Sequence, residues 1–195
     1  MIENIFKQEN LFYIFIVIVG LVLLSIIPMS LIVVGLLILL YGFVRVTSKR
    51  YIYQNSTNIL SLIDGVVEAI DTQNNTTTIY CKTNLYRPYK ALAPCDANMD
   101  IISYQKGANL PPFSYKANLL NEQIKVAFND IEVKFLSGVC NLPIKHLASK
   151  KVSQGDELFV FVDGLVIVTF DNTKYNLKVK IKDKLIAGQT LLCEL

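Results

Sequence analysis

Residues 124–135 read Ile-Lys-Val-Ala-Phe-Asn-Asp-Ile-Glu-Val-Lys-Phe, two short apolar-rich runs joined by Asn129-Asp130. Asn and Asp tolerate the left-handed backbone of a tight two-residue turn, so this stretch predicts a β-hairpin. Asp163-Gly164 lies in the same way between Leu158–Val162 and Leu165–Phe170, and it is an even stronger hairpin signature. The C-terminal part of the chain is therefore expected to consist of short strands.

Other short runs rich in β-branched and aromatic residues predict further strands. They are Ile59–Ile70, Thr76–Cys81 after an Asn-rich turn, Met99–Tyr104, Leu177–Ile181 and Thr190–Glu194. This region has no long helical period, internal repeat or low-complexity tract. Residues 59–195 therefore predict one mainly β domain, a small barrel or sandwich.

The whole chain is more apolar and less charged than an ordinary cytosolic domain. Of its 195 residues, 52% are hydrophobic and 18% are charged, and the mean hydropathy is +0.41. Soluble domains carry about 25% charged residues, so we expect part of this chain to lie in lipid. The net charge of +3 argues against a nucleic-acid-binding protein. The composition also excludes a disordered chain and a disulfide-stapled miniprotein.

The apolar excess is concentrated in Asn10–Val44, 35 consecutive positions without a charge. As one helix this stretch would be about 52 Å long, against a hydrocarbon core of roughly 30 Å. We therefore interpret Leu11–Ile27 and Leu31–Val44 as two transmembrane helices of a hairpin that is broken at Pro28. A single tilted or kinked span is the alternative interpretation.

Basic residues flank both ends of this apolar stretch. Lys7 precedes it, and Arg45, Lys49 and Arg50 follow it. The positive-inside rule then keeps both ends of a hairpin in the cytoplasm. The predicted organisation is a membrane hairpin with a basic flank (1–50), a polar connector (51–58) and a cytoplasmic β domain (59–195).

Familiar metal and catalytic motifs are missing from the sequence. Cys81, Cys95, Cys140 and Cys193 form no Cys-x-x-Cys pair, and His146 is the only histidine, which argues against a zinc site. We expect reduced, partly buried thiols and a His146 that lies at or near the surface without a catalytic role. No phosphate-binding glycine loop, Gly-x-Ser-x-Gly elbow or His-Glu-x-x-His helix occurs either.

Asp64 is the candidate catalytic residue. It precedes Gly65 inside the otherwise apolar segment Leu60–Val67. Burial of a carboxylate there would favour its protonated form and suit acid–base chemistry. The alternative is an Asp-Gly turn or bulge without chemistry.

Two other segments can be interpreted either as ordinary surface features of the β domain or as membrane contacts. Pro111–Tyr115 (Pro-Pro-Phe-Ser-Tyr) predicts a rigid loop packed on its own domain, or a loop that enters the headgroup layer. The residues Lys178, Lys180, Lys182 and Lys184 recur at the period of a strand. They predict a solvated face or a protected sheet edge, with contact to anionic lipid as the alternative.

Several segments, in chain order, resemble blocks of the short bacterial phosphatidylserine decarboxylases. Ser61–Val67 (Ser-Leu-Ile-Asp-Gly-Val-Val) is similar to the family strand Ser-Pro-Ala-Asp-Gly-x-Val, which carries the catalytic Asp. The other similar segments are Gly42–Arg45 (Phe-Arg-Asp-Pro in the family), Ala93-Pro94, Tyr104, Gly107, Asn121-Glu122, Leu136–Gly138 and Ala187–Leu191. The resemblance implies an N-terminal hydrophobic segment, a compact β domain at the membrane, and Asp64 as a retained catalytic position.

Two other catalytic positions of the family are changed. The spacing puts Tyr89 where the family has its catalytic His, and Leu165 where it has the Ser that becomes the pyruvoyl group. Without a hydroxyl or thiol at Leu165, neither the ester intermediate nor the pyruvoyl cofactor can form. A Tyr, with a reference pKa of about 10, is a poor base at neutral pH. We therefore expect no cofactor, and Asp64 remains the single matching catalytic residue.

We expect a membrane-anchored relative of these decarboxylases that acts in phospholipid metabolism at the bacterial inner membrane. It does not process itself, is catalytically inactive, and has membrane phospholipid rather than nucleic acid as its partner. One alternative is an active decarboxylase with a displaced nucleophile, such as Ser153 or Thr169. Another is a membrane-tethered β scaffold that contacts a protein partner or a second copy of itself.

Overall fold

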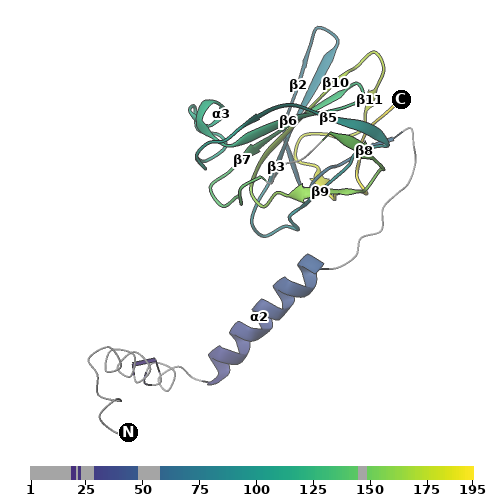
Figure 1. The fold of residues 1–195 in the computed structure, drawn as a ribbon. Coiled ribbons are helices and arrows are strands. Elements are labelled where there is room, and N and C mark those ends of the chain that lie inside the picture. The colour runs from purple at the N-terminus through teal and green to yellow at the C-terminus, as the bar shows by residue number, and fades with distance from the viewer. Residues whose placement is uncertain (1–18, 21, 23–28, 48–57, 145–148) are drawn as a thin grey trace. The chain divides into compact units, whose positions relative to one another are not determined.

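The computed structural model describes residues 19–20, 22, 29–47, 58–144 and 149–195. The chain divides into two compact units, Met1–Ser48 and Lys49–Leu195 (Figure 1). Helix α2 (Met29–Thr47) belongs to the first unit and confirms a helix over Leu31–Val44. No helix among the residues with described side chains is both long and apolar enough to cross a membrane. Since Leu11–Ile27 lies mostly outside the described residues, the two-helix hairpin stays a prediction.

The second unit is mainly β, as predicted. Its described elements are β1 (Asn58–Leu60), β2 (Gly65–Gln73), β3 (Thr76–Thr83), β4 (Lys90–Leu92), β5 (Ala97–Gln105), α3 (Ala117–Leu120), β6 (Gln123–Phe128), β7 (Ile131–Ser137), β8 (Lys150–Val152), β9 (Glu157–Val160), β10 (Gly164–Asp171), β11 (Asn176–Leu177), β12 (Lys184–Leu185) and β13 (Leu191–Glu194). Neighbouring strands pair antiparallel in every sheet described.

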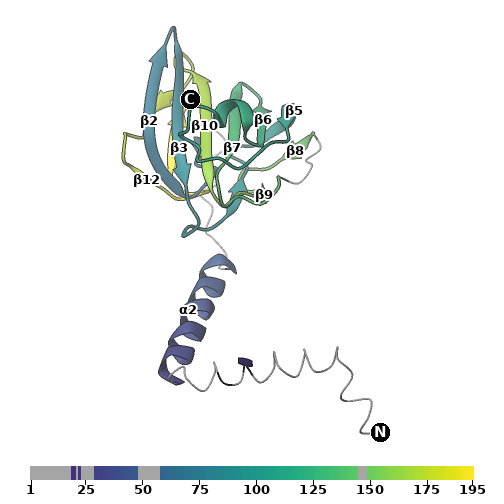
Figure 2. The ribbon, with the colours of Figure 1, turned by 90° about the vertical axis from the view of Figure 1, so that its left-hand side faces the viewer.

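The strands form one large and two small sheets. The eight-stranded sheet has the order β12-β2-β3-β10-β7-β6-β5-β8, which can be followed from left to right in Figure 2. The three-stranded sheet has the order β1-β13-β11, and β4 pairs with β9. Strand β10 therefore lies in the interior of the large sheet, between β3 and β7.

Two tight turns are formed by local sequence. The predicted hairpin at Asn129-Asp130 is confirmed, because Phe128 of β6 lies opposite Ile131 of β7. Asn74 and Asn75 join β2 to β3, with φ angles of 45° and 65°. Two successive residues with positive φ are what a type I′ hairpin turn requires, and Asn adopts this backbone more easily than most residues.

The predicted hairpin at Asp163-Gly164 is wrong. Strand β9, which precedes this pair, is bonded to β4, whereas β10, which follows it, is bonded to β3 and β7. The carbonyl of Asp163 accepts a hydrogen bond of 2.9 Å from the N–H of Gly138. This bond continues the pairing with the β7 side, so the Asp-Gly pair begins a central strand instead of closing a turn.

Two further strand predictions need correction. Ile59–Ile70 is interrupted between β1 and β2, where the Ser61 hydroxyl donates to the carbonyl of Ile63 (2.8 Å) in a bend. Of the predicted strand Leu177–Ile181, only Leu177 belongs to a strand, β11 (Asn176–Leu177).

A turn also breaks the row of alternating lysines that was expected on one strand face. The Asp183 carboxylate accepts a hydrogen bond from the Lys180 N–H (2.7 Å), and Lys182 has a φ of 75°. Lys178 pairs with Glu194, and Lys184 lies on β12. The four lysines therefore do not share one face of a strand.

The main core lies between the large sheet and the two small ones. Val67, Ile79, Val168 and Phe135 of the large sheet belong to one buried cluster with Leu192 of β13. Phe135, Phe159 and Phe161 pack edge to face within this cluster, with ring centroids 4.7–6.3 Å apart. A second, smaller cluster consists of Ala117, Leu136 and Leu165, with Tyr80 and Ile167 against it. Because side chains alternate along a strand, Leu165 and its buried neighbour Val166 lie on opposite faces of the large sheet.

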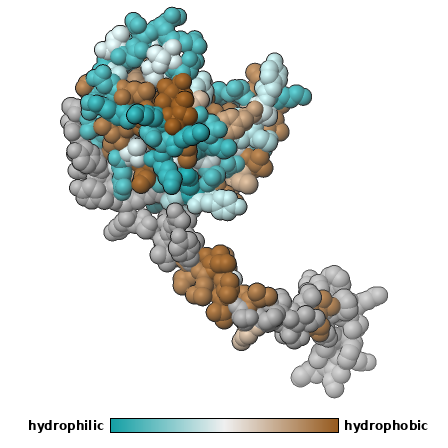
Figure 3. Space-filling model, turned by 180° about the vertical axis from the view of Figure 1, so that it is seen from behind, coloured by the Kyte–Doolittle hydropathy of each residue, from teal (hydrophilic) through white to brown (hydrophobic). Residues whose placement is uncertain are grey.

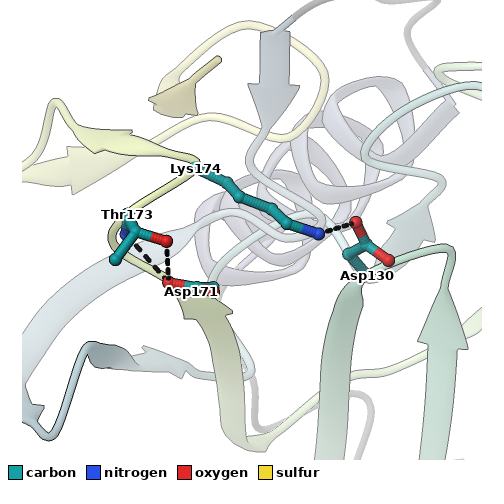
Figure 4. A network of polar contacts seen from close by, with 4 residues as sticks. All are labelled: Asp130, Asp171, Thr173 and Lys174. Carbon is teal, nitrogen blue, oxygen red and sulfur yellow. Dashed lines mark hydrogen bonds and ion pairs between the residues drawn. The ribbon is translucent and has the colours of Figure 1, made fainter.

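A polar network joins the turn after β10 to the β6–β7 hairpin (Figure 4). The Asp171 carboxylate accepts hydrogen bonds from the N–H and the hydroxyl of Thr173, at 2.8 and 2.7 Å. These hydrogen bonds lower the pKa of Asp171. The Lys174 ammonium donates to Asp130 at 2.7 Å, which raises the pKa of Lys174. This network lies at the Asp171 end of β10, opposite the end at which Gly164 begins the strand.

Candidate functional site

Two of the segments that resemble the decarboxylase family, Asp64-Gly65 and Asp163-Gly164, lie at one end of the large sheet. Gly164, the first residue of β10, lies opposite Thr83 of β3 and Ser137 of β7. Val66 lies opposite Lys82, so β2 begins at the same end, directly after Asp64. The antiparallel register thus brings Asp64-Gly65 and Asp163-Gly164 to the same end, although about a hundred residues separate them in the chain.

Both glycines at this end are required by close backbone approach. Gly164 has a φ of +150°, and a Cβ added there would lie 2.7 Å from the Phe161 ring and closer still to the carbonyl oxygen of Leu136. A Cβ at Gly65 would lie 2.5 Å from the carbonyl oxygen of Lys82. No larger residue fits these positions without moving backbone, which is the physical reason for glycine at each.

Buried amide groups hold the segment before β10 in place. The Asn141 side chain donates to the Ser137 hydroxyl (2.9 Å) and accepts from the N–H of Val162 (2.8 Å). The Asp163 carboxylate accepts from the N–H of Cys140 at 3.2 Å. Buried polar groups that find partners in this way fix a single backbone arrangement, so the peptide bond between Gly164 and Leu165 has a rigid environment.

A second part of the same network uses other residues of the family-like segments. The Asn121 side chain donates to the carbonyl of Ser137 at 2.6 Å. The Glu122 carboxylate accepts from the Tyr104 hydroxyl (2.7 Å) and from the N–H of Ile144 (3.1 Å). The bond to Glu122 raises the pKa of Tyr104. These hydrogen bonds connect four residues of the segments that resemble the family: Tyr104, Asn121, Glu122 and Ser137.

Leu165 lies on the outer face of the sheet, beneath the segment that contains α3. Its side chain is 6% exposed and packs with Ala117 and Leu136. In Figure 2 this segment crosses in front of β10 and β7. The position that the resemblance aligns with the family's nucleophile is thus filled by a packed apolar side chain, and it offers no group that could attack the preceding carbonyl.

A pocket of about 470 Å³ adjoins Leu165 on the outer face of the sheet. Its walls come from β2, β3 and β10 on one side and from the segment 112–118 on the other. They are formed by Glu68, Ala69, Tyr80, Pro112, Phe113, Ser114, Tyr115, Asn118 and Leu165. Most of these side chains are apolar or aromatic, and Glu68 is the one charged residue among them. Such a lining suits a small ligand that is partly apolar.

No protein-family model, curated protein or solved structure matches the chain.

The structure places the candidate catalytic residues as follows. Asp64 lies in the bend before β2, as the alternative of a turn predicts. The residue is also buried, with 7% of its surface exposed. Tyr89 is half-buried, and its carbonyl accepts from the N–H of Phe161 at 2.7 Å. Since the Phe161 ring also packs against Gly164, Tyr89 lies near the start of β10. His146 lies outside the described residues.

The two alternative nucleophiles lie elsewhere. Thr169 is on β10, five residues beyond Gly164, which corresponds to roughly 17 Å along a strand. Its hydroxyl is 3.4 Å from that of Thr78. Ser153 lies in an exposed turn, where its N–H donates to the Asp156 carboxylate (2.8 Å). Neither the Thr169 hydroxyl nor the Ser153 hydroxyl therefore lies beside Gly164.

The cysteines form no disulfide, and three of the four are buried. Burial raises the pKa of Cys81 to about 12, that of Cys95 to about 11 and that of Cys193 to about 12, while Cys140 is exposed. Within the part of the chain that the structure describes, no three His, Cys, Asp or Glu residues lie together as metal ligands would. The buried thiols therefore act as core residues.

The sequence prediction missed Glu68 as a site residue. Glu68 is the extra residue of a β-bulge, because Val67 lies opposite Cys81 while Ala69 already lies opposite Tyr80. A bulge redirects one side chain relative to its neighbours and often occurs at binding sites. The segment Pro111–Tyr115 is a loop, as predicted, and its residues 112–115 line the pocket, although Phe113 and Tyr115 are 52% and 94% exposed. Nothing in the local sequence around Glu68 indicates the bulge.

Proposed function

We propose that this chain is a membrane-anchored relative of the phosphatidylserine decarboxylases that does not process itself and binds phospholipid. In this proposal the N-terminal apolar segment is a membrane hairpin, and the β unit is a small barrel or sandwich on the cytoplasmic side of a bacterial inner membrane. It carries no pyruvoyl group and performs no decarboxylation. Asp64 is then the remnant of a catalytic site.

The observation that carries the proposal is the position of Leu165. A buried leucine stands at the first strand residue after Asp163-Gly164, next to a largely apolar pocket. The family's chemistry needs a hydroxyl at this position, and the leucine removes it. The pocket remains beside it, which favours binding without reaction.

The apolar surface of α2 supports the membrane part of the proposal. Every residue of the stretch 31–40 except Gly35 is Leu, Ile or Val, and the helix appears as a hydrophobic stretch in Figure 3. A helix that is apolar on all sides has no face suited to water. Lipid would surround such a helix favourably, and the basic residues after it would remain at the cytoplasmic surface.

The full chain, purified in detergent, provides the test. Intact mass should give one species of 22.0 kDa, and the chain should float with phospholipid vesicles. Two fragments together with a hydrazine-reactive new N-terminus would instead support an active decarboxylase with a displaced nucleophile. Vesicle binding that ignores headgroup type, together with co-purification of a protein partner or self-association, would support the scaffold alternative.

A further inference from the structure

Glu68 is the charged residue among those that line the pocket beside Leu165. The residue is exposed and lines the pocket. It has no ion pair with any described cation: the ion pairs of the described carboxylates involve Glu157, Glu132, Asp130 and Glu194. A negative charge in a mostly apolar lining favours a ligand that brings a positive charge.

Three aromatic residues line the same pocket as Glu68. Tyr80 comes from β3, whereas Phe113 and Tyr115 come from the loop after the proline pair, and Tyr115 is 94% exposed. The faces of aromatic rings carry a negative potential that attracts cations. The Lys82 ammonium already lies 4.7 Å from the centre of the Phe113 ring, so this ring takes part in such an interaction within the protein itself.

We propose that the pocket formed by Glu68, Tyr80, Phe113 and Tyr115 binds the ammonium group of a phospholipid headgroup. This inference rests on the proposed function and adds the ligand chemistry to it. The Glu68 carboxylate neutralises the ammonium while the rings surround it. The Lys82 ammonium beside Phe113 provides the positive charge that the neighbouring phosphate of the headgroup requires.

A free zwitterion tests the pocket without a membrane. Phosphoethanolamine and phosphocholine are titrated calorimetrically into the full chain, with glycerol 3-phosphate as the probe that has the phosphate but no ammonium. The two ammonium compounds should bind and glycerol 3-phosphate should bind at least about tenfold more weakly. Equal binding of the three probes, or no binding of the ammonium compounds, overturns the inference.

A matched pair of variants assigns the effect to Glu68. Glu68→Gln keeps the size of the side chain and removes its charge, and it should weaken ammonium binding about tenfold. Glu132→Gln removes a carboxylate that pairs with Lys125 on the strands β6 and β7, and it should leave binding unchanged within about twofold. Phe113→Leu keeps an apolar wall without the ring and should weaken ammonium binding as well. Similar effects of both Glu variants contradict the assignment.

Vesicles separate this inference from the function on which it rests. Flotation is compared for vesicles of phosphatidylethanolamine with phosphatidylcholine and for vesicles of phosphatidylglycerol alone. Preference for the ammonium lipids that Glu68→Gln abolishes supports both proposals. Binding to all vesicles without that preference overturns the ammonium site and leaves phospholipid binding intact. Binding of the free zwitterions without binding to any vesicle keeps the pocket, but it overturns a lipid as its ligand and with it the proposed function.

Discussion

Replacing Leu165 by serine puts a hydroxyl at the position that the resemblance aligns with the processed Ser of the decarboxylases, and replacing it by alanine shortens the side chain without adding a hydroxyl. Leu165 is 6% exposed and packs on Ala117 and Leu136. Each variant loses three carbon atoms from this cluster. At roughly 0.8 kcal/mol for each buried methylene, the loss of transfer free energy is about 2.4 kcal/mol.

The cavity contribution should be small for both variants. Leu165 lines the open pocket, so the space left by truncation stays accessible to water instead of forming a closed void. Water in the pocket can also solvate the serine hydroxyl, which should keep Leu165→Ser within about 1 kcal/mol of Leu165→Ala. Because domains of this size have unfolding free energies of about 5–15 kcal/mol, both variants should remain folded.

Urea denaturation and intact mass are the two assays. The unfolding free energy of each variant should fall by about 2–3 kcal/mol, and each should remain one chain of about 22 kDa. Serine alone should not produce cleavage, since the resemblance puts Tyr89 where the family has its catalytic His. Fragments 1–164 and 165–195 from Leu165→Ser would refute this reasoning, and a stability loss below about 1 kcal/mol would refute the packing of Leu165.

Three further perturbations follow from single contacts. The buried Thr83 hydroxyl has no hydrogen-bond partner among the described residues, so Thr83→Val should raise the unfolding free energy by about 1 kcal/mol in urea denaturation; a loss of stability would contradict this. At pH 8 a thiol reagent should label the exposed Cys140 rapidly and Cys81 only after unfolding, since burial raises the pKa of Cys81 to about 12; equal rates would show that Cys81 is accessible. The hydrogen bonds from Thr173 lower the pKa of Asp171 in the folded state. Their stabilising contribution is therefore present above the ordinary carboxyl pKa and is lost as the pH falls through the lower pKa of the folded state. Asp171→Asn should consequently flatten the fall of the melting temperature below about pH 4. An unchanged fall would count against these hydrogen bonds.

Some of the fold could be predicted because it depends on two or three consecutive residues. Asn129 and the pair Asn74-Asn75 adopt positive φ angles, and the strands beside each turn pair with one another. The backbone preference of Asn acts locally, whatever the rest of the chain does. The same holds for the mainly β character of the second unit, which follows from short runs of β-branched and aromatic residues.

Asp163-Gly164 shows where local preference is insufficient. The pair has the composition of a turn, but β9 bonds to β4 and β10 bonds to β3 and β7. Whether a short strand pairs with its neighbour or with a distant strand depends on which arrangement buries more apolar surface and satisfies more backbone groups. That comparison involves the whole unit, and a window of ten residues does not contain it.

The sequence by itself determined the mainly β unit, its two Asn turns, the helix over Leu31–Val44 and the absence of a hydroxyl at Leu165. These features follow from residue identity and from preferences between neighbours. Only the tertiary structure decided that Asp64-Gly65 and Asp163-Gly164 lie at one end of the sheet, and that Glu68, the bulge residue of β2, lines a pocket with aromatic residues of a distant loop. Strand register and loop packing are set by contacts between residues far apart in the chain, so no local pattern records them.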